Sequence, residues 1–343
     1  MSNPRMGDAR IASSKDDARI ASSKGDACIG QTKTTMMTTR WKPIAIALCL
    51  GSSAMAQQDP QFTQYMFNML ALNPAYAGSA ERLQIKALTR HQWVGFEGAP
   101  TTQTLTAHAP VWHESLCIGG TILRDEHGPV TQYGFNVDVA YRIIMNKSKL
   151  SFGIKGGVNL FQGRFSELSP LDANDQVFQA DVTSKTDPQF GFGVMYYGDR
   201  GYIGLSTPKF LRTEFYETDS LAFVSETGQR PHWFLSAGYV FDLGTYTKLK
   251  PTMLLKAVDG APMSFDISAN FLFYEKFWLG AMYRHEDAIG AMAQYLISDR
   301  FSVGYAYDFT LSPLRDHSGG SHEVMIGLEL GKKITGIRSP RYF

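Results

Sequence analysis

Apolar and polar residues alternate along most of the chain. In 133–143, the odd positions carry tyrosine, phenylalanine, valine or isoleucine, whereas the even positions carry glycine, asparagine, aspartate, alanine or arginine. The same alternation occurs in 150–160, 264–271, 301–309 and 323–330. A period of two places successive side chains on opposite faces of a β-strand. The pattern therefore predicts a chain made mostly of strands, each with one apolar and one polar face.

The alternation predicts fourteen strands. Each is about as long as a tilted strand needs to be to cross a bilayer. The expected strands are 80–91, 101–111, 116–124, 132–144, 149–161, 189–198, 201–208, 233–243, 247–257, 264–273, 276–285, 288–297, 300–309 and 322–331.

The connections between these strands are sorted by length. The connections after even-numbered strands are brief, whereas the long ones all follow odd-numbered strands and are 92–100, 125–131, 162–188, 209–232 and 310–321. Long loops at one end and tight turns at the other are typical of outer-membrane barrels. A soluble β-sandwich has no reason to sort its loops in this way. We therefore expect an all-β, antiparallel, up-and-down transmembrane β-barrel over 80–331.

The chain upstream of the expected strands has its own organisation. A polar near-repeat in 8–33 is too short for a solenoid, so 1–35 is expected to be a non-structural extension from a start assigned too far upstream. In 36–56, two basic residues, a short apolar run and an Ala-Met-Ala site predict a secretory signal peptide. A mature chain from Gln57 with an even number of strands would have both termini in the periplasm, including a C-terminal tail at 332–343.

The segment 57–79 departs from the strand pattern. Its apolar positions follow a helical spacing that ends at Asn73-Pro74. We expect a short amphipathic helix that plugs or caps the barrel, or docks on a periplasmic partner, and these two roles are compatible. The apolar positions are Phe62, Tyr65, Met66, Met69 and Leu70.

Charged residues occupy inward positions of the first and last expected strands. The first strand carries Arg82, Lys86 and Arg90, and the last carries Glu323 and Glu329. These strands become neighbours when an antiparallel barrel closes, so we predict an opposite-charge seam that helps to specify closure. The alternative is that these charges only hydrate a polar lumen.

Composition supports a β-rich chain and argues against nucleic-acid binding. Lys and Arg number 33 and Asp and Glu 32, so there is no basic surplus for a phosphate backbone. Aromatic residues reach 13%, and 32 glycines accompany them, which favours strands and turns over helical bundles or disorder. The three cysteines have neither disulfide-framework nor metal-ligand spacing.

Motifs for catalysis are missing from the sequence. It contains no GxSxG, HExxH, P-loop or GxGxxG pattern, so neither an enzyme nor a cofactor is expected. Asp125-Glu126-His127 and His285-Glu286-Asp287 contain residue types that bind metals or transfer protons. Both fall at expected loops, where charged residues are ordinary, so a surface role is favoured for each.

Several blocks carry long and unusual motifs. They are QDPQFTQYMFNMLALNPAYAGS (58–79), RHQWVGFEGAPTTQTLTAH (90–108), WLGAMYR (278–284), GYAYDF (304–309) and PRYF (340–343). In these blocks, and over nearly the whole expected mature chain, the sequence resembles the PorP/SprF family of type IX secretion system outer-membrane proteins from Bacteroidetes. The extension 1–35 adds nothing to this resemblance.

The resemblance implies a barrel without catalysis, embedded in outer-membrane lipid. It implies periplasmic type IX secretion components as partners on one side and a large exported cell-surface protein, such as a gliding adhesin, on the other. A fourteen-strand barrel is too narrow for a folded adhesin, so an anchoring or accessory role is favoured over a translocation pore. A passive channel for small solutes is the main alternative, and an outer-membrane enzyme is a weaker one.

The resemblance also implies where partners bind. We expect exported proteins at the loops 162–188 and 209–232, and periplasmic components at 57–79 and 331–343. The motif positions implied in partner binding are Asp59, Pro60, Gln61, Phe62, Tyr65, Asn68, Asn73, Pro74, Tyr76, Gly78, Gln92, Trp93, Gly98 and Pro100.

Overall fold

A computed structural model describes residues 60–167, 181–211, 230–259 and 261–331. These residues belong to one compact unit, Gly51–Phe343. The expected extension 1–35, the signal peptide 36–56 and the tail 332–343 lie outside the described residues.

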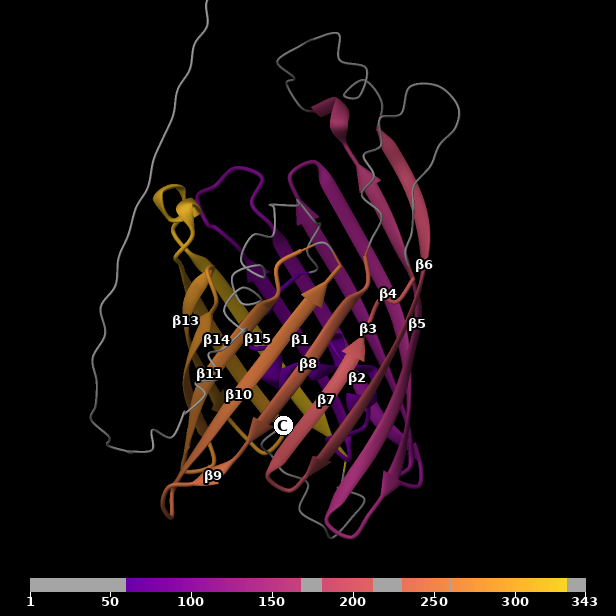
Figure 1. The fold of residues 1–343 in the computed structure, drawn as a ribbon, viewed down its shortest axis with the longest axis vertical. Coiled ribbons are helices and arrows are strands. Elements are labelled where there is room, and N and C mark those ends of the chain that lie inside the picture. Colours follow the sequence, from indigo (N-terminus) through magenta and orange to yellow (C-terminus); the bar gives the residue numbers. More distant parts are fainter. Residues whose placement is uncertain (1–59, 168–180, 212–229, 260, 332–343) are drawn as a thin grey trace, which may run out of the picture. The chain divides into compact units, whose positions relative to one another are not determined.

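The described residues form a closed antiparallel β-barrel (Figure 1). Its strands are β1 (Leu83–His91), β2 (Thr101–Trp112), β3 (Leu116–His127), β4 (Val130–Ile144), β5 (Ser148–Gly163), β6 (Val182–Gly198), β7 (Gly201–Thr207), β8 (His232–Tyr239), β9 (Phe241–Asp242), β10 (Thr247–Val258), β11 (Ser264–Phe273), β12 (Phe277–Arg284), β13 (Ala288–Leu296), β14 (Phe301–Thr310) and β15 (Ser321–Leu330).

The barrel has the fourteen strands that the alternation predicts. Of the fifteen elements, β8 and β9 both pair with β10 and are separated only by Val240, so they make one barrel strand. Every other strand pairs with its neighbours in the chain, and β1 pairs with β15 from Leu83–Leu330 to His91–His322 to close the sheet. Closure removes the sheet edges, which lipid could not hydrogen-bond.

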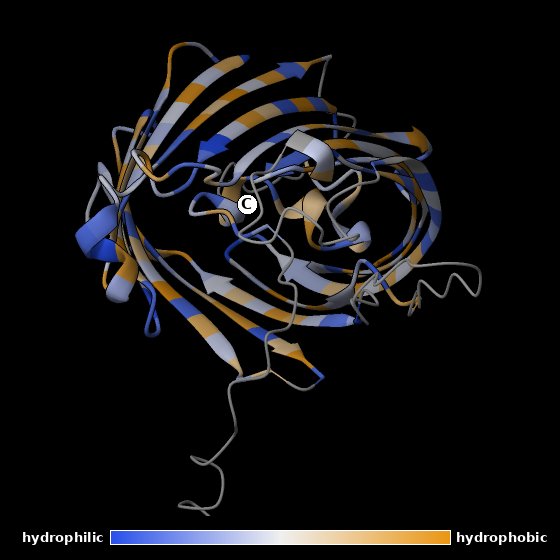
Figure 2. Cartoon of the chain, turned by 90° about the horizontal axis from the view of Figure 1, so that it is seen from above, coloured by the Kyte–Doolittle hydropathy of each residue, from blue (hydrophilic) through white to orange (hydrophobic). Residues whose placement is uncertain are grey.

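The two faces of the wall have opposite character. In β4, Phe135, Val137 and Tyr141 point outward and are exposed, whereas Asp138 and Arg142 point inward and are fully buried. Figure 2 shows the same alternation of hydrophobic and hydrophilic residues along the strands. The outward face is therefore suited to lipid. Among the described residues, no helix combines the length and the apolar character needed to cross a membrane.

One expected loop is a tight turn. The range 125–131 is expected as a long connection between the strands 116–124 and 132–144, but β3 runs to His127 and β4 begins at Val130, so only Gly128 and Pro129 lie between them. Charged side chains do not interrupt a ladder of backbone hydrogen bonds, and Gly128 supplies the positive φ of 53° that the turn requires. The long connections that remain follow β1, β5, β7 and β14, all at one end of the barrel.

An arginine on the outward face should destabilise the barrel according to its depth in the membrane. Ile154 lies near the middle of β5 and is 64% exposed. Ile154→Arg should lower the free energy of unfolding in lipid vesicles by about 2–4 kcal/mol, measured by urea titration. Tyr246→Arg is the control, because Tyr246 is similarly exposed but lies in the turn before β10, where the cost should be about 0–1 kcal/mol. Equal losses would contradict the assignment of the lipid face.

Candidate functional site: the plugged lumen

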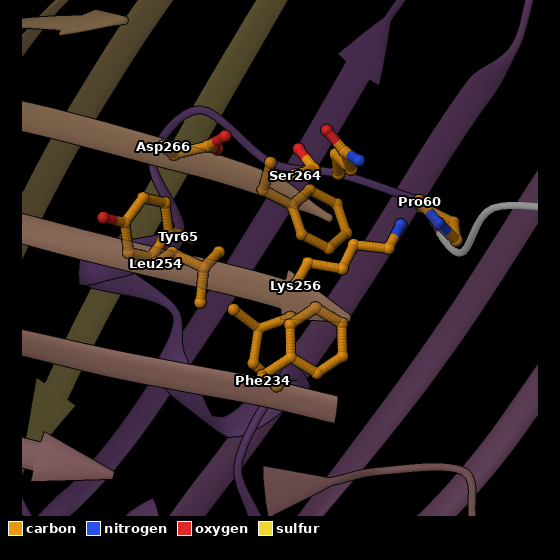
Figure 3. Close-up of a pocket in the computed structure, with 10 residues that line it drawn as sticks. Pro60, Tyr65, Phe234, Leu254, Lys256, Ser264 and Asp266 are labelled. Carbon is orange, nitrogen blue, oxygen red and sulfur yellow. The ribbon is translucent and has the colours of Figure 1, made fainter. Parts of the chain in front are cut away.

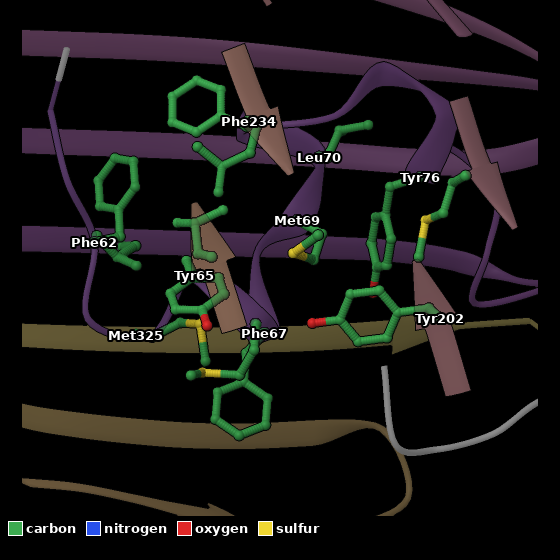
Figure 4. Packing of buried hydrophobic residues seen from close by; sticks show 14 of the residues in the cluster. Phe62, Tyr65, Phe67, Met69, Leu70, Tyr76, Tyr202, Phe234 and Met325 are labelled. Atoms are coloured by element: carbon green, nitrogen blue, oxygen red, sulfur yellow. The ribbon is translucent and has the colours of Figure 1, made fainter. Parts of the chain in front are cut away.

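The segment before β1 lies inside the barrel. Its residues 60–82 form three short 3-10 turns, η1 (Tyr65–Phe67), η2 (Met69–Ala71) and η3 (Pro74–Tyr76). We call 60–82 the plug. Its apolar side chains make a buried cluster with inward side chains of the wall, including Tyr202, Phe234 and Met325 (Figure 4).

The expected amphipathic helix is replaced by these turns. The apolar positions of the expected helix are buried, but so are the polar residues between them, including Thr63, Gln64 and Asn68. A helix with one polar face needs water on that face, whereas the wall surrounds the plug. Two of these polar side chains bond to the wall instead: Thr63 donates to Asp308 at 2.5 Å, and Asn68 accepts from the hydroxyl of Thr106 at 2.8 Å.

The plug crosses the lumen once, from the end with long connections to the end with tight turns. Thr63 donates to Asp308 near the end of β14 at 2.5 Å, and the Lys155 ammonium donates to the carbonyl of Leu70 near the middle of β5 at 3.3 Å. Glu81 then forms an ion pair with Lys149 at the start of β5. Its first residue, Pro60, therefore lies toward the long-connection end.

Asn73 and Pro74 start a turn rather than end a helix. Proline occupies the first position of η3, and the Asn73 side chain accepts a hydrogen bond from the Ala75 amide at 2.9 Å. Asn73 also donates to the carbonyl of Val194 at 3.3 Å, which ties the turn to β6. The wall leaves room for this turn: a Cβ on Gly153 would lie 2.3 Å from the Ala75 nitrogen.

A network of buried charges holds the upper part of the plug. Glu323 on β15 accepts hydrogen bonds from two consecutive plug amides, those of Thr63 at 2.9 Å and Gln64 at 2.8 Å. Arg90 on β1 pairs with Glu323 at 3.2 Å and with Asp308 on β14 at 2.8 Å. Buried charges are stable only when they are paired and hydrogen-bonded, so the plug completes a network that the wall alone leaves open.

Arg284 extends this network around the wall. It pairs with Asp266 on β11 at 3.0 Å and approaches Asp308 at 3.9 Å. It also donates to the carbonyl of Phe62 at 3.5 Å. We call Arg90, Glu323, Asp308, Arg284 and Asp266 the charge belt. The charge pattern of the first and last strands predicts only the Arg90 and Glu323 members of this belt. The other three are charged residues at inward positions of strands, close to the long-connection end of the barrel, and this shared position is the signal that could have predicted them.

The expected seam charges lie at the junction of β1 and β15. Arg90 is directly opposite Glu323 in the strand register, and Arg82 forms an ion pair with Glu329. Lys86 has no acidic residue directly opposite, because Gly327 occupies that position of β15. Gln84 donates a hydrogen bond to Glu329 at 2.9 Å. That the seam specifies closure stays a prediction.

Aromatic residues of the plug contact polar groups of the wall. The Tyr65 hydroxyl is 2.8 Å from the hydroxyl of Thr252 on β10. The Lys250 ammonium lies 5.2 Å from the centre of the Phe67 ring and 5.6 Å from that of Trp278, within the range of cation–π attraction.

Three cavities along the buried part of the plug are small. The cavity beside Tyr65, Phe234 and Leu254 has about 20 Å³, roughly the room for one water molecule (Figure 3). Two further cavities along the plug have about 60 Å³ each. Among the described residues, no group of three or more His, Cys, Asp or Glu side chains could hold a metal ion.

The motif positions implied in partner binding fall into two groups. Phe62, Tyr65, Asn68, Asn73, Pro74, Tyr76 and Gly78 belong to the buried part of the plug. Pro60, Gln61, Gln92, Trp93 and Pro100 line a cavity at the long-connection end. Gly98 is exposed in the loop after β1, and Asp59 lies outside the described residues. The buried group meets the barrel rather than the surroundings, and partner binding by any of these residues stays a prediction.

Comparison with known proteins identifies a family. A family model described as type IX secretion system membrane protein PorP/SprF matches residues 54–328. No curated protein has a significantly similar sequence.

Several solved structures are similar at low identity. Omp33 of Acinetobacter baumannii is 8% identical, with a TM-score of 0.43, over 73% of this chain and 98% of its own. A FadL homologue of Pseudomonas aeruginosa is 12% identical, with a TM-score of 0.39, over 79% of this chain and 94% of its own. The NanC porin is 10% identical, with a TM-score of 0.38, over 73% and 100%.

Removing the carboxylate of Glu323 should destabilise the protein far more than removing that of Glu329. Glu323→Ala leaves two buried plug amides without their acceptor and Arg90 without one partner, so the free energy of unfolding should fall by about 3–5 kcal/mol. Glu329→Ala is the control on the same strand, because its side chain is 30% exposed and its ion pair should contribute about 0–1 kcal/mol. Urea unfolding in detergent measures both, and similar losses would argue against the network.

A side chain at Gly153 should displace the plug. Gly153→Val puts atoms where η3 lies, whereas Gly156→Val on the same strand meets nothing within 4 Å and is the control. We expect Gly153→Val to increase single-channel conductance in planar bilayers above the wild-type level, and Gly156→Val to leave it unchanged. A folded Gly153→Val protein with wild-type conductance would contradict the packing of the plug.

Proposed function

Because the chain belongs to the PorP/SprF family of type IX secretion system membrane proteins, we propose that it is a non-catalytic outer-membrane component of that system. Its role is to support the export or surface anchoring of large cell-surface proteins such as gliding adhesins. The observation that carries the proposal is the plug, which fills the lumen and is bonded to the wall along its length. A filled barrel can hold a partner at the membrane but cannot pass a folded one.

The plug also separates this proposal from a passive channel for small solutes. An open channel needs a continuous wet path through the lumen, as in large porins. Cavities of about 20 and 60 Å³ between plug and wall do not favour such a path in the described part of the chain. Catalysis is not proposed either, because the buried titratable groups of the charge belt are paired with each other.

The proposed orientation puts the long connections outside and the tight turns in the periplasm. Exported proteins would then meet the long-connection end, whereas periplasmic type IX components would meet the tight turns and the C-terminal end of β15. Most of the two loops expected to contact clients, 162–188 and 209–232, lies outside the described residues. In this orientation Pro60 lies toward the outside and Leu330 toward the periplasm, because the plug crosses the lumen once. The expectation that both termini are periplasmic stays a prediction, because the residues before Pro60 lie outside the described part of the chain.

Co-purification tests this function. The full-length protein, tagged at a tight turn, is isolated from detergent-solubilised outer membranes, and mass spectrometry identifies what accompanies it. We expect a large multi-repeat surface protein or periplasmic type IX components, enriched over a tagged porin from the same membranes. A barrel that is recovered alone and conducts ions would contradict the proposal and favour the passive channel.

A further inference from the structure

A cavity of about 610 Å³ lies above the plug at the long-connection end. Its floor is Pro60 and Gln61, and its sides include Gln92, Trp93 and the turns after β3 and β12. We call this cavity the vestibule. Both charged triplets noted in the sequence contribute to it, the first through Asp125 and His127 and the second through all three of its residues. Its volume is in the usual range of ligand pockets.

Carboxylates outnumber arginine and lysine in the described lining of the vestibule. The side chain of Glu286 is 83% exposed, that of Asp287 39% and that of Asp125 12%. Asp125 accepts a hydrogen bond from the Thr102 hydroxyl at 2.5 Å. Arg284 is 1% exposed, is bonded to Asp266 of the charge belt and lies 3.5 Å from the Asp287 carboxylate. The vestibule therefore attracts cationic groups. Its carboxylates come from two separate turns, which suits an extended ligand with more than one positive charge.

The remaining lining favours a peptide over a simple cation. Gln92 and Gln132 contribute amide side chains to the lining, a residue type that hydrogen-bonds a peptide backbone. Trp93 offers an aromatic ring to a cation, and Met263 is an exposed, adaptable apolar contact.

The vestibule is held in shape before any ligand arrives. Trp93 has a positive φ of 43°, and its amide bonds the Ser321 hydroxyl at 3.2 Å. The next amide, that of Val94, bonds the carbonyl of Gly320 at 2.8 Å, so the loops after β1 and β14 are joined. On the other side, the His285 ring stacks on Phe265 with ring centres 4.6 Å apart. Such preorganisation lowers the entropy cost of binding.

We propose that the vestibule binds an extended peptide segment that carries lysine or arginine side chains. The cationic groups contact Asp125, Glu286 and Asp287, one of them against Trp93, while Gln92 bonds the peptide backbone. This site stands on the cavity alone and holds whether or not the barrel serves type IX secretion.

Fluorescence anisotropy of a labelled peptide tests the site. The probe is Gly-Arg-Gly-Arg-Gly with fluorescein, added to the full-length protein in detergent at low salt. We expect saturable binding, and binding at least about tenfold weaker to the triple variant Asp125→Asn, Glu286→Gln, Asp287→Asn. Glu286→Gln alone should weaken binding by about two- to threefold without affecting the fold, because Glu286 is on the surface. Glu275→Gln, in the turn after β11 at the opposite end, is the matched control and should bind normally.

Three outcomes would overturn the proposal. The first is unchanged binding to Glu286→Gln and to the triple variant. The second is equal binding of a probe with glutamine in place of arginine, which would remove the role of charge. The third is competition by spermine at the same concentration as unlabelled peptide, which would make the vestibule a general cation site.

Discussion

The carboxylate of Glu323 contacts both the strand junction that closes the barrel and the plug that lies inside it. It faces Arg90 across the β1–β15 junction, and it accepts hydrogen bonds from the amides of Thr63 and Gln64. A closed barrel leaves its inward polar groups out of the lipid, but they still need partners. Here the plug supplies some of them, so the closed junction of β1 and β15 and the filled lumen share the same carboxylate.

The same constraint explains why the plug is irregular. Inside a polar wall, each stretch of plug backbone must find its own partners, and it does so in short turns rather than in one helix. Arg142 bonds the carbonyl of Gly78, Ser206 bonds that of Leu72 and Lys155 bonds that of Leu70. Glycine in the wall lets the turns approach closely, as at Gly153 and Gly193. The result is a lumen filled by side chains and backbone together.

The wall was predictable from the sequence, and the lumen was not. Lipid requires apolar side chains on one face of every strand, so a period of two marks fourteen strands. The ends are less exact, since β6 begins at Val182, seven residues before its expected start. The charged residues 125–127 were expected in a loop but belong to β3, because a charged side chain indicates contact with water and does not end the backbone hydrogen bonding of a strand. That the strands of Arg90 and Glu323 are neighbours followed from chain order, since the first and last strands of a closed meander must meet. Asp308, Arg284 and Asp266 were missed, because their contacts depend on strand tilt and on the plug, which no local pattern records.

The position of Glu323 bears on how the chain assembles. Thr63 precedes it by 260 residues, so the plug is made long before the strand that secures it. A chain that stops before β15 would keep Thr63, Gln64 and Arg90 but lack the Glu323 carboxylate, which accepts hydrogen bonds from all three. The amides of Thr63 and Gln64 therefore gain their acceptor only when β15 is present, so a truncated chain would leave these two buried donors unbonded.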